Sequence, residues 1–134
     1  MTGMANLQEL LRSMAPVLVE GTFVFCSVKG DYAEYAHHRP LASFGELEGL
    51  SLVLRKEAAL ESNLAFQGEF RCISLTVHSS LEAVGLTAVL AGTLADAGIS
   101  ANVIAAFHHD HIFVPSHLAA AALSALNDLS ARSA

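Results

Sequence analysis

The order of the elements predicted for the second half of the chain is the feature that most constrains the fold. From Arg71 to Val77, apolar and polar side chains alternate, which is typical of a strand with one buried face. An apolar stripe with helical spacing follows and ends at Gly98. We expect the rest to be a strand at 99–107, a tight turn at His109–Asp110, a strand at 111–114 and a helix capped by Ser116.

This order predicts an α+β fold in which helices cover one face of an antiparallel sheet. A ferredoxin-like βαββαβ unit has the same order and one further strand. No such strand follows the last predicted helix, which carries its apolar face between Ala119 and Leu129. The missing edge strand must come from elsewhere or be absent, and the short extended segment Pro16–Val19 could supply it.

The first half of the chain repeats the second half weakly. Its predicted strands are 22–28, 41–44 and 50–54, and its predicted helices are 7–14 and 56–60. Gly49–Ala59 aligns with the segment from His108 onward after a shift of about 60 residues. Residues 31–39 are ambiguous where the second copy has a helix. We therefore expect two units in tandem, 1–66 and 67–134, of which the first is degenerate.

Composition excludes several functional classes. The net charge is −6 and there is no basic run, so the charge pattern of a nucleic-acid binder is missing. The hydrophobic fraction is 53%, but polar residues and glycines interrupt the best apolar stretch, Val84–Ala97, so we expect no membrane span. The N-terminus does not read as a secretory signal. Cys26 and Cys72 lie in apolar strands, which favours free thiols in the cytoplasm over a disulfide or metal pair.

Two stretches carry a family resemblance. They are PVLVEGTFVFCSV in the first half and ISLTVHSSLEAVGLTAVLAGTLADAGISANVIAAFHHDHIFVP in the second. In both, the sequence resembles the ACT-domain family of small ferredoxin-like modules, and in particular short bacterial proteins with two such domains in tandem. The resemblance implies that a small molecule, usually an amino acid, binds between the first strand–helix loop and the second strand, often at an interface between two units.

On this sequence, the resemblance points to the loop 78–85 and the strand 99–107. Free amides at the helix start, from Val84 onward, would attract a carboxylate, and Gly85 would let a ligand approach the backbone closely. Asn102 offers a donor and an acceptor, and Glu82 could pair with an ammonium group. The complete set of candidate ligand-binding residues is Ser79, Ser80, Leu81, Glu82, Val84, Gly85, Leu86, Asn102, Val103 and Ile104.

Several of these residues also have a purely structural interpretation. Ser79 or Ser80 could simply cap the helix, Gly85 could only allow close packing, Asn102 could be solvated, and Glu82 could be a favourable acidic residue in a first helical turn. The case for a site depends on their convergence on one loop and one strand.

The cluster His108–His111 is the main alternative. In a strand, His109 and His111 share a face and could hold a metal, which would make the chain a metal-binding protein or a metal-dependent enzyme. A polar turn is the simpler interpretation. The chain contains no nucleotide-binding or nucleophile motif of the GxGxxG, Walker or GxSxG type.

We therefore expect a regulatory amino-acid sensor rather than an enzyme, with no cofactor and no metal. It would act through a partner chain or through oligomerisation. Exposed sheet edges and helix faces rich in small residues favour a homodimer.

Overall fold

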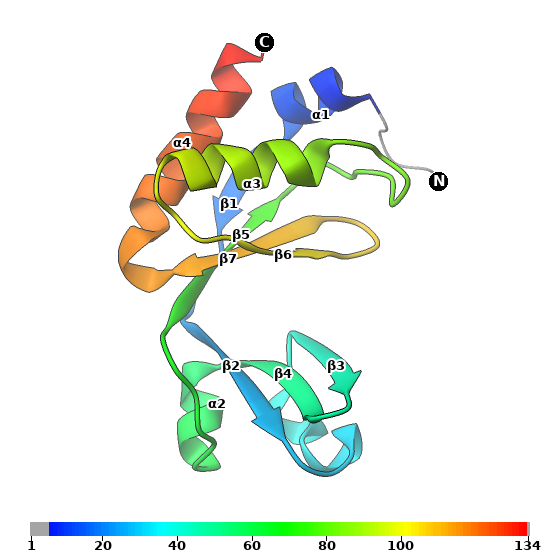
Figure 1. Ribbon diagram of the computed structural model, residues 1–134, viewed down its shortest axis with the longest axis vertical. Helices are drawn as coiled ribbons and strands as arrows, with labels where there is room; N and C mark the ends of the chain where they lie inside the picture. The colour runs from blue at the N-terminus through cyan, green and yellow to red at the C-terminus, as the bar shows by residue number, and fades with distance from the viewer. Residues whose placement is uncertain (1–5, 134) are drawn as a thin grey trace. The chain divides into compact units, whose positions relative to one another are not determined.

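The computed structural model describes residues 6–133, and these residues form two compact units. Unit 1 consists of the segment up to Glu20 together with the segment from Arg71 onward, and unit 2 consists of Gly21–Phe70 (Figure 1). The two compact units do not coincide with the expected tandem units, 1–66 and 67–134, because unit 1 is formed by both ends of the chain. The expected boundary stays a prediction about the sequence repeat. The α+β class and the antiparallel sheets with helices packed on them are confirmed.

Unit 1 contains a four-stranded sheet in the order β1-β5-β7-β6. Its strands are β1 (Pro16–Leu18), β5 (Phe70–Leu75), β6 (Asn102–Ala105) and β7 (Asp110–Pro115). β1 pairs antiparallel with β5, with Pro16 opposite Leu75 and Leu18 opposite Ile73. The segment before unit 2 therefore supplies the edge strand that the second half of the sequence lacks, as the sequence suggested.

Three helices cover one face of this sheet: α1 (Leu7–Ser13), α3 (Leu86–Asp96) and α4 (Ala119–Arg132) (Figure 1). α1 begins at Asn6, whose side chain accepts a hydrogen bond from the Glu9 amide at 3.0 Å. The helices bury side chains that recur every three or four residues, such as Leu86, Leu90 and Leu94 in α3. Together with the inner faces of β5 and β7 they form one apolar core.

The hairpin between β6 and β7 differs from the prediction. β6 is much shorter than the expected strand 99–107, and the turn lies around Phe107 and His108, where the Ala106 amide donates to the His109 carbonyl at 3.1 Å. Asp110 was expected in the turn but is the first residue of β7 and is 6% exposed. Ser116 does not cap α4: it starts a short 3-10 helix, η3 (Ser116–Leu118), and Leu118 occupies the cap position.

Unit 2 has a sheet in the order β3-β4-β2, formed by β2 (Phe23–Val28), β3 (Ala42–Glu46) and β4 (Gly49–Arg55). Helix α2 (Lys56–Glu61) packs against β2 and β4, and its Ala59 is fully buried in the core of this unit. The ambiguous residues 31–39 form two short 3-10 helices, η1 (Tyr32–Glu34) and η2 (Ala36–His38), neither of which buries a residue.

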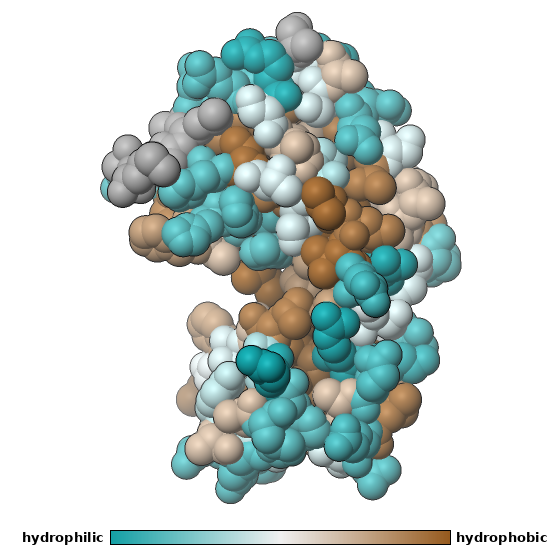
Figure 2. Space-filling model, turned by 180° about the vertical axis from the view of Figure 1, so that it is seen from behind, coloured by the Kyte–Doolittle hydropathy of each residue, from teal (hydrophilic) through white to brown (hydrophobic). Residues whose placement is uncertain are grey.

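Both units expose large apolar side chains. In Figure 2, apolar surface appears among hydrophilic side chains on each unit. The most exposed members are Leu47, Val84, Phe44, Phe107 and Leu81. Phe44 and Leu47 belong to the hairpin of unit 2, and the other three lie at the loop before α3 and at the β6–β7 turn of unit 1.

Candidate functional site

The loop that joins β5 to α3 holds most of the predicted ligand residues, and it has its own internal bonding. Ser79 is buried, and its Oγ donates to Oδ2 of Asp110 at 3.1 Å. The Ser80 Oγ accepts from the Glu82 amide at 3.1 Å, and the Ser80 carbonyl accepts from the Ala83 amide at 3.0 Å. Each serine therefore orders the loop, and neither caps α3.

Gly85 is the N-cap of α3 and lies in the left-handed region at φ +96°, where residues with side chains are strained. A Cβ at this position would lie 3.3 Å from Cδ2 of Leu7, so the glycine also allows α1 to pack closely. No side chain caps α3, and its first intrahelical bond runs from the Val89 amide to the Gly85 carbonyl at 3.0 Å. The amides of the first turn of α3 therefore have no acceptor within the helix.

The other predicted residues of this loop fall into an exposed group and one buried residue. Leu81, Glu82 and Val84 are exposed, with Val84 83% accessible, whereas Leu86 is 3% exposed and belongs to the core. Leu86 can therefore offer a ligand only its backbone.

The predicted partner strand lies partly beyond the reach of the loop. In β6, Asn102, Val103 and Ile104 stand opposite Phe113, Ile112 and His111. The end of β6 nearest the loop is Ala105, which is opposite the Asp110 that Ser79 contacts. Asn102 is three residues further along, about 10 Å away at the usual rise of a strand. The structure brings Ser79 to Asp110 and leaves Asn102 at the other end of the strand.

The histidines of the second half gather around the β6–β7 turn. The Nδ1–H of His109 donates to the Val77 carbonyl at 3.1 Å, and Nδ1 of His111 is hydrogen-bonded to the Ser74 hydroxyl at 2.7 Å. The rings of His78 and His108 are 5.2 Å apart between centroids, and the Phe107 ring is 5.0 Å from that of His108. Burial lowers the pKa of His111, the nearby His109 lowers it further, and Asp110 partly offsets both.

The metal alternative finds no support in this arrangement. Within residues 6–133, no group of three or more histidine, cysteine, aspartate or glutamate side chains has the geometry to hold a metal ion. His109 and His111 make separate bonds to the backbone and to Ser74.

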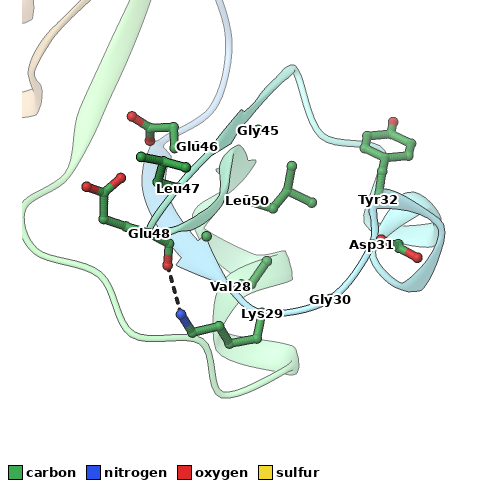
Figure 3. A pocket seen from close by; sticks show the side chains of 11 residues that line it. Val28, Lys29, Gly30, Asp31, Tyr32, Gly45, Glu46, Leu47, Glu48 and Leu50 are labelled. Atoms are coloured by element: carbon green, nitrogen blue, oxygen red, sulfur yellow. Dashed lines mark hydrogen bonds between the residues drawn. The ribbon is translucent and has the colours of Figure 1, made fainter.

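Unit 2 contains a pocket that the sequence did not predict. It has a volume of about 350 Å³ and lies between Val28–Tyr32, at the end of β2, and Gly45–Leu50, in the β3–β4 hairpin (Figure 3). Such a volume falls within the usual range for small-molecule sites, about 300–1,000 Å³. The Lys29 ammonium donates to the Glu48 carbonyl at 2.8 Å, so its side chain links the two sides of the pocket. The Tyr35 hydroxyl donates to the Lys29 carbonyl at 2.9 Å.

The only sequence signal for this pocket was the weak one at residues 31–39. In unit 1 the corresponding connection is the 11-residue helix α3. In unit 2 two three-residue 3-10 helices replace it and leave space beside the strand ends.

Comparison with known proteins identifies the family. Two family models, each described as an ACT domain, match residues 2–71 and 67–128 in tandem. The chain belongs to the ACT-domain family. Tandem ACT domains support a ligand-binding regulatory role for this protein. No curated protein sequence matches the chain.

Solved structures of similar fold agree with this assignment. A Vibrio cholerae protein of unknown function, described as a possible transport protein, is 51% identical over 92% of this chain and 95% of its own, with a TM-score of 0.85. An Agrobacterium tumefaciens protein is 15% identical over 86% of this chain and 87% of its own, with a TM-score of 0.71. The ligand-free regulatory subunit of aspartate kinase from Thermus thermophilus is 11% identical over 87% of this chain and 97% of its own, with a TM-score of 0.65. The last two likenesses concern the fold alone.

None of the helices described in residues 6–133 has both the length and the apolar character needed to cross a bilayer.

Proposed function

We propose that this protein is a regulatory sensor of a free amino acid, and that the pocket of unit 2 is its primary binding site. The pocket is the observation that carries the proposal. It combines a size suited to a small ligand, an ammonium group and a backbone-lined rim. A free amino acid presents one carboxylate and one ammonium group, and both can be recognised by such groups.

Lys29 would bind the carboxylate of the amino acid. Within residues 6–133 the Lys29 ammonium donates one hydrogen bond, to the Glu48 carbonyl, so its other N–H donors are available to a ligand. The rim includes Gly45, where nothing lies within 4 Å of the place that a Cβ would take, so a ligand can approach the main chain there. Main-chain carbonyls there are suitable acceptors for the ammonium group of the ligand.

The loop before α3 remains a second proposed site. Seven of the ten residues predicted from the sequence lie in this loop and at the start of α3, and the other three lie in β6. The uncapped start of α3 and the exposed Leu81 and Val84 support the site. Because Asn102 is distant from the loop, the parts of this site that could act together are residues 79–86 and the nearer end of β6.

Calorimetry and thermal unfolding across the twenty amino acids test the proposal. A ligand at about 100 times its Kd should raise the free energy of unfolding by about 2.7 kcal/mol. No response to any amino acid would refute the sensor function. Lys29→Met should weaken binding at the unit 2 pocket, whereas Val84→Ser should weaken binding at the loop, so the two variants separate the two sites.

We further propose that the chain has no catalytic activity of its own and acts through a partner or a second copy. The free cysteines, Cys26 and Cys72, are both buried and unbridged, which supports a reducing compartment such as the cytoplasm. The proposed homodimer forms along β3, an edge strand that pairs only with β4 among the described strands. Phe44 is 73% exposed on this strand, and pairing would bury it.

A further inference from the structure

Strand β3 is exposed along almost its whole length. Its side chains are partly buried at Ala42 and exposed at each of the following residues of the strand. Phe44 within the strand is 73% exposed, and Leu41 and Leu47, which flank the strand, are 46% and 103% exposed. Among the described strands β3 pairs with β4 alone, so its other edge is open to a further strand. Large apolar side chains gathered along an open edge indicate a surface that another chain covers.

Opposite charges lie at the two ends of this surface. Arg39, the C-cap of η2, precedes β3 and is exposed. Glu46 ends the strand and Glu48 follows in the turn of the β3–β4 hairpin, and both are exposed. Among the described residues, neither Arg39 nor Glu48 forms an ion pair, and the Lys29 ammonium contacts the carbonyl of Glu48. The surface therefore has a positive start, an apolar middle and an acidic end, and it is complementary to a reversed copy of itself.

An antiparallel pair of β3 strands centred on Phe44 matches the apolar and the charged pattern together. In such a pair, each step away from Phe44 along one copy is matched by the same step in the opposite direction along the second copy. Leu41 then stands opposite the partner's Leu47, and the turn that contains Glu48 comes beside the partner's Arg39. A shift of two residues would instead place Leu47 opposite the partner's Ser43 or the partner's Arg39, and it would separate the two Phe44 rings.

We propose that two copies of the chain pair through β3 in this antiparallel register, and that the Arg39 guanidinium of each copy binds the Glu48 carboxylate of the other. This inference rests on the homodimer of the proposed function and adds its register and its charge pairs. Arg39 is always charged and offers several N–H donors to a carboxylate. Leu47 and Glu48 also line the pocket of unit 2. The second copy therefore borders the proposed ligand site, and the partner's Arg39 adds a positive charge at its rim.

Charge reversal tests the register through the mass of the full-length chain. Arg39→Glu and Glu48→Lys should each raise the Kd of the dimer about tenfold or more, because each homodimer then contains two contacts between like charges. Glu48→Lys retains the backbone carbonyl that the Lys29 ammonium contacts. An equimolar mixture of the two variants should form dimers again, because both contacts in the mixed dimer join opposite charges. Light scattering measures the mass across a dilution series, and native mass spectrometry with one chain isotopically labelled identifies the mixed dimer.

Arg12→Glu is the matched control for the charge reversal. Arg12 is exposed on α1 of unit 1, so this variant should dimerise as the unchanged protein does. An unchanged Kd in Arg39→Glu or Glu48→Lys, or the absence of a mixed dimer, would overturn the register and leave the homodimer and amino-acid sensing intact. A monomeric unchanged protein would instead refute the homodimer of the proposed function. Circular dichroism checks that each variant is folded.

Discussion

Ser79 donates a hydrogen bond to Asp110 across 3.1 Å, and both side chains are buried. The bond joins the loop before α3 to the first residue of β7, which are 31 positions apart in the chain. It therefore fixes the loop of the second proposed site against the sheet of unit 1. A buried carboxylate needs such a partner, because removing it from water without one is costly.

Replacing Ser79 with alanine should destabilise the protein. The substitution removes a donor from the buried Asp110 carboxylate, which costs about 1–3 kcal/mol. Ser80→Ala is the matched control: among the described residues the Ser80 hydroxyl bonds to the nearby Glu82 amide alone, and the change should fall within about 0.5 kcal/mol. Urea unfolding measures both variants. Equal stability of Ser79→Ala and the unchanged protein would show that water replaces the bond.

The stability of the protein should decrease as the pH falls below about 6.5, the ordinary pKa of histidine. The folded protein lowers the pKa of His111 chiefly through burial, so the unfolded chain binds a proton at His111 more readily. Proton uptake by the unfolded state then favours unfolding. The contribution of His111 is fully present above the unfolded pKa and is lost as the pH falls through the folded pKa.

His111→Asn should make the pH profile of stability shallower below this pH. The exposed His117, replaced by asparagine, is the control and should leave the profile unchanged. A profile of equal slope in His111→Asn and the unchanged protein would contradict the role of His111. Urea midpoints measured from pH 5 to pH 8 provide the comparison.

The two cysteines should react slowly with thiol reagents in the folded protein. Burial raises the pKa of both Cys26 and Cys72, which lowers the fraction of reactive thiolate, and it also blocks access. Ellman's reagent should therefore label both thiols only as fast as the protein opens, and at once in urea. Rapid labelling under native conditions would contradict the burial of the two thiols.

Phe44→Lys should weaken the proposed homodimer by placing a charge on the edge strand β3. Light scattering coupled to size-exclusion chromatography reports the mass across a dilution series. Leu60→Lys introduces the same charge at a 57% exposed position on α2, away from that edge, and should leave the mass unchanged. A monomeric protein before any substitution would exclude the dimer.

The elements with strong periodicity were predicted well from the sequence. The alternation of Arg71–Val77 and the stripe ending at Gly98 gave β5 and α3 with small errors at their ends. These patterns depend on burial of one face, which is a local property of the chain. Even the edge strand at Pro16 was predicted, because a ferredoxin-like sheet requires a fourth strand and few segments could provide it.

The predictions were wrong where the local structure depends on a contact with a residue far away in the sequence. Asp110 resembles a turn residue, yet it is buried in β7 because Ser79 provides a donor that no local pattern reveals. Ser116 has the character of a cap, but its Oγ is buried and has no hydrogen-bond partner in the part of the chain described. The pocket of unit 2 was not predicted because it lies beside strand ends that the short helices η1 and η2 leave uncovered. This depends on how the elements of unit 2 pack together, which no local sequence pattern reveals.

The pairing of β1 with β5 has a consequence for how the protein can be shortened. A truncated product that starts at residue 67 would contain the whole second sequence repeat, yet the backbone of β5 would lose the strand that protects it. Such a fragment should be prone to self-association, and adding back a peptide spanning α1 and β1 should rescue its solubility. Genetic dissection of this protein therefore has to remove Gly21–Phe70 from the middle rather than cut the chain in half.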